Sequence, residues 1–125
     1  RYQIPMVWTG GALNVRDTVV RTYASQIDLA STLLKQLQLE VTDFKFSKNI
    51  LDQDIKGFSF LHFPDGFGYI DQEMYQMYDK GNFTPLVMRG AGTREDSLKA
   101  KVFMQMVAKD FNTRLTHGTN EISKR

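Results

Sequence analysis

The sequence contains no cysteine and only two histidines among its 125 residues. Without cysteine the chain can form no disulfide, no thiolate metal site and no cysteine nucleophile. The two histidines, His62 and His117, do not form a pair at helical spacing, so a histidine-rich zinc site is not expected. His62 follows two phenylalanines at alternate positions, and we expect it to be a packed or hydrogen-bonded structural residue.

The sequence also lacks an excess of charge of one sign and a long apolar run. Lysine and arginine number 16, and aspartate and glutamate number 14, which gives a formal net charge of +2. This balance does not favour a nucleic acid or an anionic membrane as a partner. No apolar run approaches the roughly 20 residues of a membrane-spanning helix. Hydrophobic residues make up 42% and charged residues 24%, which is typical of a folded globular protein.

The first part of the chain predicts a strand followed by a helix. Residues 3–9 form a short apolar run closed by two glycines, as in a strand buried on both faces. Residues 15–23 are a second candidate for extended structure. Ser25 and Asp28 fit a capping box, and apolar positions at helical spacing then predict a helix that ends near Gln38. The residues of this helix expected to be buried under a sheet are Leu33 and Leu34.

The second part predicts a small sheet and a long helix. Short aromatic runs separated by turn residues favour an antiparallel meander. Pro85 indicates that the last of these runs lies at a sheet edge. Thr93 and Asp96 form a second capping-box candidate, which precedes a helix expected over about residues 94–115. The four predicted strands cover residues 58–63, 67–70, 75–78 and 83–89.

These elements together predict an α/β protein in the broad sense, described more closely as an α+β fragment. An N-terminal buried strand and helix precede a small antiparallel meander, which the long C-terminal helix covers. Phe103 and Val107 are expected to bury the inner side of that helix. Residues 1–115 are assigned to the folded segment, and residues 116–125 are polar and are expected to form a frayed tail.

No segment carries a complete signature for catalysis or for ligand binding. Residues 52–63 begin like a calcium-binding loop, but Lys56 and Phe63 stand where oxygen ligands are needed. Gly90 and Gly92 could cradle an anion before the long helix, although a helix entry alone explains them. No Gly-x-Ser-x-Gly motif is present. The residues alone therefore predict no catalytic, cofactor-binding or metal-binding side chain in this chain.

Several segments nevertheless resemble segments of one enzyme family. Residues 4–8, Ile-Pro-Met-Val-Trp, resemble the strand that follows the last metal-binding motif in sulfatase-like enzymes. Residues 25–34 look like that family's (Ser/Gly)-Gln-x-Asp-(Leu/Ile)-x-x-Thr-Leu-Leu helix, and residues 44–51 resemble the segment after it. Residues 67–71 and 78–79 look like strands near the carboxyl end. The chain is thus similar to the C-terminal part of a bacterial sulfatase family protein resembling lipoteichoic acid synthase, of the alkaline phosphatase superfamily.

The resemblance implies a part of an alkaline-phosphatase-like fold in a metal-dependent enzyme that cleaves or transfers phosphate or sulfate esters. It implies a Ser, Thr or formylglycine nucleophile and a divalent metal (Mn, Mg, Zn or Ca) that neutralises charge on the transferred group. The family's nucleophile segment and Asp-His-Gly motif precede the Ile-Pro strand, so no catalytic residue is carried onto this chain. Relatives often have His just before Ile-Pro, where this chain has Gln3.

The resemblance also implies an extracytoplasmic protein that reaches the membrane only through an N-terminal part. The chain does not begin with methionine, and we expect it to be cut from a longer protein. Its main partner is then the remainder of its own catalytic domain. The isolated chain is expected to self-associate through its first strand and Trp8, because open strand edges and apolar patches promote pairing.

Two functional hypotheses follow. The first is a C-terminal structural segment of a sulfatase-like phosphate or sulfate ester hydrolase or phosphoglycerol transferase, inactive by itself. The alternative is a non-catalytic module that binds a glycan or a protein through its aromatic meander.

Overall fold

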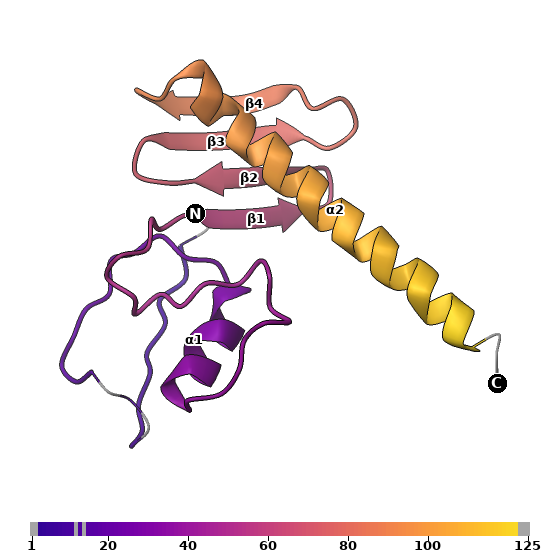
Figure 1. The fold of residues 1–125 in the computed structure, drawn as a ribbon. Helices are drawn as coiled ribbons and strands as arrows, with labels where there is room; N and C mark the ends of the chain where they lie inside the picture. Colours follow the sequence, from indigo (N-terminus) through magenta and orange to yellow (C-terminus); the bar gives the residue numbers. More distant parts are fainter. Residues whose placement is uncertain (1–2, 12, 14, 123–125) are drawn as a thin grey trace. The chain divides into compact units, whose positions relative to one another are not determined.

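The computed structural model describes residues 3–11, 13 and 15–122, with side chains as far as Thr116. The chain divides into two compact units, each of which is described by itself. The first unit comprises Arg1–Arg21 and Gln26–Ile55, and the second comprises Thr22–Ser25 and Lys56–Arg125. The first unit contains helix α1, and the second contains a four-stranded sheet and helix α2 (Figure 1).

The sheet of the second unit is an antiparallel meander. Its strands lie in the order of the sequence, and each pairs with its neighbours in antiparallel register. This arrangement confirms the predicted meander, and Pro85 lies on an edge strand as expected. The strands are β1 (Ser59–Phe63), β2 (Gly66–Ile70), β3 (Met74–Asp79) and β4 (Pro85–Gly90).

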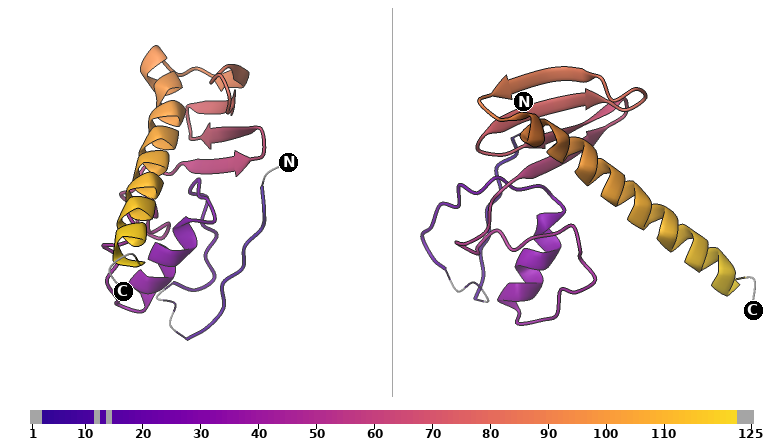
Figure 2. Two further views of the ribbon diagram at one scale, coloured as in Figure 1. Left: turned by 90° about the vertical axis from the view of Figure 1, so that its right-hand side faces the viewer. Right: turned by 45° about the horizontal axis from the view of Figure 1, so that its top comes forward.

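Helix α2 (Arg94–Ile122) lies across one face of this sheet (Figure 2). The predicted capping box is confirmed: the backbone N–H of Thr93 donates to Asp96 Oδ2 at 2.7 Å, and the Asp96 N–H faces Thr93 Oγ1 at 3.4 Å. The helix extends beyond its predicted end at Leu115, so residues 116–122 are helical instead of forming a tail. No proline interrupts these residues, and one glycine costs only about 1 kcal/mol in a helix. The last three positions of the predicted tail, 123–125, lie outside the described residues.

An aromatic core joins α2 to the sheet. Phe67 and Ala100 are fully buried, and Tyr78 stacks on Phe67 with ring centroids 5.5 Å apart. Phe103 packs against this core from the helix, with its ring 4.7 Å from that of Phe60. Phe103 therefore occupies the predicted inner side of the helix, whereas Val107 is only half-buried.

Two buried polar side chains fix the start of α2 on β3. Gln76 is fully buried, and its Nε2 donates to the carbonyl oxygen of Asp96 at 2.7 Å. The Tyr78 hydroxyl donates to the carbonyl oxygen of Ser97 at 2.8 Å and also lies 3.2 Å from Gln76 Oε1. Burial raises the pKa of the Tyr78 phenol, so this donor keeps its proton. The helix is thus held in one position along the sheet by directional bonds as well as by packing.

The first unit differs from the prediction in its extended segments. Neither residues 3–9 nor residues 15–23 form a strand within the described chain, and Val7 is 85% exposed. A strand needs a partner for its backbone groups, and no described segment pairs with either run. The predicted N-terminal buried strand is therefore wrong for this structure.

Helix α1 (Asp28–Gln36) begins later than predicted. Its N-cap is Ile27, without a side-chain cap, so the helix does not begin at Ser25. The Ser25 hydroxyl instead accepts a hydrogen bond from the backbone N–H of Phe60 at 2.6 Å, within the second unit. Ser25 thus contributes a hydrogen bond to β1 of the sheet.

A left-handed residue ends α1. Gln38 has φ +59°, and its N–H donates to the carbonyl of Lys35, while the N–H of Leu39 donates to the carbonyl of Leu34. This pair of bonds is a Schellman motif, in which glycine is usual because other residues are strained at positive φ. The helix therefore ends where predicted, but with an unfavourable residue at its final turn.

Replacing Gln38 with glycine should stabilise the first unit. The free energy gained by relieving the strain at positive φ is larger than the entropic cost of the more flexible unfolded chain. We therefore expect Gln38→Gly to raise the free energy of unfolding by about 0.5–1 kcal/mol. Urea unfolding followed by the fluorescence of Trp8, the only tryptophan, measures this. As a control, Lys35→Gly within the helix should lower stability by about 1 kcal/mol. An equal loss of stability in both variants would contradict the assignment of Gln38 as a strained left-handed residue.

Candidate functional site

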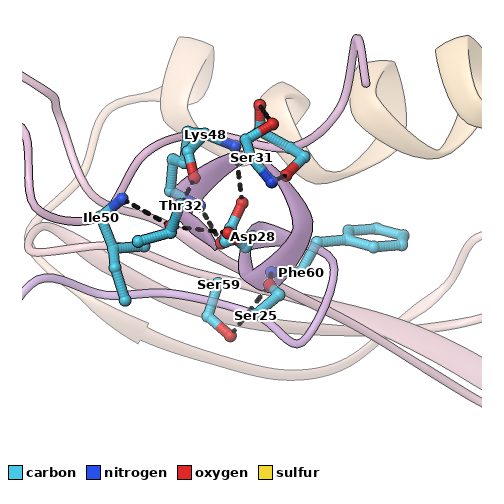
Figure 3. Close-up of polar contacts among 9 residues, drawn as sticks. Ser25, Asp28, Ser31, Thr32, Lys48, Ile50, Ser59 and Phe60 are labelled. Carbon is cyan, nitrogen blue, oxygen red and sulfur yellow. Dashed lines mark hydrogen bonds and ion pairs between the residues drawn. The ribbon is translucent and has the colours of Figure 1, made fainter. Parts of the chain in front are cut away.

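The side of α1 that is buried is polar, and the side that faces solvent is apolar. Asp28 is 1% exposed and Thr32 is fully buried, whereas Leu33 is 49% exposed. Leu29 and Leu37 are exposed as well. The prediction that Leu33 is buried is therefore wrong, and Leu34, for which burial was also expected, is only half-buried. Figure 3 shows the buried polar side chains of α1 and the segment that they contact.

A buried ion pair is the centre of this arrangement. Asp28 Oδ2 lies 2.5 Å from Lys48 Nζ, and the two side chains are 1% and 9% exposed. Asp28 Oδ1 accepts a second hydrogen bond, at 3.0 Å, from the backbone N–H of Lys48. Burial lowers the pKa of Lys48, and its hydrogen bond to Asp28 opposes that shift. The carboxylate thus holds both the side chain and the backbone of one residue.

Thr32 lies one helical turn after Asp28 and connects α1 with the segment that contains Lys48 and Ile50. Its hydroxyl shares one proton between the carbonyl oxygens of Asp28, at 2.6 Å, and Lys48, at 3.2 Å. Its Oγ1 also accepts the backbone N–H of Ile50 at 3.1 Å. The bond to the Asp28 carbonyl confirms that this threonine bonds back to its own helix, as its position predicts. Its other two contacts make it a bridge between two segments.

Two serines complete the contact. The Ser31 hydroxyl donates to the carbonyl of Ser47 at 3.2 Å, and the Ser31 backbone N–H donates to the Ser47 hydroxyl at 3.1 Å. The polar cluster, defined as Asp28, Ser31, Thr32, Ser47 and Lys48, therefore fastens residues 47–50 to α1 along the buried side of the helix.

The polar cluster has the chemistry of a structural contact. The hydroxyls of Ser31 and Thr32 donate to backbone carbonyls, and the amine of Lys48 is paired with a carboxylate. A nucleophile needs a base that can take its proton, and the carboxylate of Asp28 is bound instead by an amine and an amide. In the described part of the chain, no three His, Asp or Glu side chains gather in a way that could hold a metal ion. The donor set present does not fit the divalent metal of the sulfatase-like enzymes.

The other candidates of the sequence belong to the second unit. His62 is exposed on β1, so the expectation that it is either packed or hydrogen-bonded is wrong as regards packing. The side chain of His117 lies outside those described. Gly90 has φ +123°, and a Cβ there would lie 2.1 Å from the Glu73 carbonyl oxygen, so backbone geometry explains this glycine. The N-terminus of α2 already accommodates the carboxylate of Asp96.

A network of charges surrounds the N-terminus of α2. Lys99 Nζ lies 2.6 Å from Asp96 Oδ1 and 3.2 Å from Asp71 Oδ2. Asp71 Oδ1 accepts the backbone N–H groups of Glu73 and Met74 in the turn between β2 and β3. The hydrogen bond from Lys99, followed by those from Thr93, lowers the pKa of Asp96 from 3.8 to about 2. The network ties the first turn of α2 to a hairpin of the sheet.

Comparison with protein-family models, with curated proteins and with solved structures finds no match for this chain. In the described residues, no helix combines the length and the apolar character needed to cross a membrane.

The buried ion pair predicts a non-additive response to mutation. Lys48→Met removes the cation that compensates the buried carboxylate of Asp28, and we expect it to destabilise the first unit by about 3–5 kcal/mol. Asp28→Asn in the same chain removes that charge but keeps an oxygen for the Lys48 N–H, so the double variant should regain most of the loss. Urea unfolding followed by Trp8 fluorescence gives both values. A double variant less stable than Lys48→Met alone would show that the carboxylate is not the source of the loss.

The low pKa of Asp96 predicts acid sensitivity at the start of α2. The folded-state pKa of Asp96 lies below its ordinary value, so the ionised carboxylate contributes to folding stability. This contribution is present above pH 3.8 and is lost as the pH falls towards about 2. An NMR titration of the Asp96 carboxyl should give a midpoint near 2. Lys99→Met removes the main cause and should raise this midpoint. A midpoint that is unchanged in the variant would contradict the role of Lys99.

Proposed function

We propose that this chain is the C-terminal structural segment of a sulfatase-like enzyme that hydrolyses or transfers phosphate or sulfate esters, as a phosphoglycerol transferase does. The observation that carries the proposal is the contact between residues 25–34 and 44–51. These are the two segments whose residues resemble consecutive segments of that family. In the polar cluster, Asp28 and Thr32 of the first segment bond to Lys48 of the second, and Ser31 of the first bonds to Ser47 of the second. A structural contact of this kind gives the motif a physical purpose.

The exposed apolar side of α1 supports the same proposal. A helix at the surface of a soluble protein normally turns its apolar stripe inwards, whereas α1 turns Leu29, Leu33 and Leu37 outwards. Ile4 and Val7 are exposed in the same unit. Large exposed apolar side chains gathered in one unit are typical of a face that another polypeptide covers. The remainder of the catalytic domain is the partner that we propose for it.

The chemistry of such an enzyme is assigned to that remainder. The donor groups of the described residues do not fit the divalent metal, and the cluster contains no activated nucleophile. This segment therefore contributes support: the ion pair keeps residues 47–50 on α1, and α1 presents its leucines to the rest of the domain. We propose an extracytoplasmic location for the whole protein, from the resemblance.

The alternative is a non-catalytic module that binds a glycan or a protein through its aromatic meander, and its glycan form receives less support. Glycan binding needs exposed aromatic faces, whereas Phe67, Tyr69 and Tyr78 are buried in the core of the second unit. Phe58 and Phe60 pack against the same core. The aromatic residues of the meander are therefore used mainly to hold α2.

The chain alone should have no esterase or transferase activity. Purified chain would be assayed with an aryl phosphate and an aryl sulfate, each with manganese, magnesium, zinc or calcium. The same assay on the protein encoded by the complete reading frame should show turnover, and that frame should encode an Asp-His-Gly motif shortly before Arg1. Turnover by the chain alone that a substitution within it abolishes would contradict the proposal, as would a complete frame without that motif.

The exposed apolar surface of the first unit should make the isolated chain self-associate. Val7→Lys and Leu33→Lys place a charge on this surface, and each should shift the association to higher protein concentration. Light scattering across a dilution series measures the shift. Gln53→Lys adds the same charge at an exposed polar position of the same unit and serves as the control. A parent chain that remains monomeric at high concentration, or an equal effect of all three variants, would contradict the assigned surface.

A further inference from the structure

We draw no further inference here: the strongest candidate, the apolar side of α2 beyond the sheet, where Phe111 and Leu115 are more than half exposed, carries none because nothing in the structure shows what covers it.

Discussion

The first unit depends on the need to compensate one buried charge. The Asp28 carboxylate has almost no contact with solvent, so its stability requires a cation and hydrogen-bond donors nearby. Lys48 supplies the ammonium group and a backbone N–H, and both come from a segment 20 residues further along the chain. The orientation of α1 follows from this requirement. Once the side with Asp28 and Thr32 faces residues 47–50, the leucines on the other side must face outwards.

In the second unit, too, buried polar groups are compensated by the element packed against them, but here the groups are neutral. Gln76 and Tyr78 are polar residues in the core, and each satisfies its donor at a carbonyl in the first turn of α2. Apolar packing by Phe103 supplies contact area but tolerates sliding, whereas hydrogen bonds fix one position. Both units therefore place their directional bonds where a helix meets a second segment. Both helices also expose apolar side chains, Leu29, Leu33 and Leu37 on α1 and Phe111 and Leu115 on α2.

The parts of the fold that were predictable depend on local interactions. Alternating aromatic residues and turn residues gave the four strands of the meander, and the Thr93–Asp96 capping box located the start of α2, because these signals act within a few residues. The failures concern contacts distant in sequence. The leucine spacing of α1 indicated a helix correctly, but which side is buried depends on Lys48, which the periodicity of residues 28–36 does not contain. Likewise the run at residues 3–9 has the composition of a strand without a described partner to pair with. The ion pair between Asp28 and Lys48, at the centre of the polar cluster, gave no sequence signal.

The hydroxyl of Ser25 limits the way in which the sheet can grow. It occupies the N–H of Phe60 on β1, one of the two outermost strands, while on the opposite outermost strand Pro85 has no N–H to offer. Unpaired donors on such strands are what recruit further chains into extended fibrils. With one such donor occupied on β1 and one absent from β4, each edge strand offers fewer backbone N–H groups to a further strand. Both edges of the sheet are therefore weaker templates for pairing than fully open edges would be.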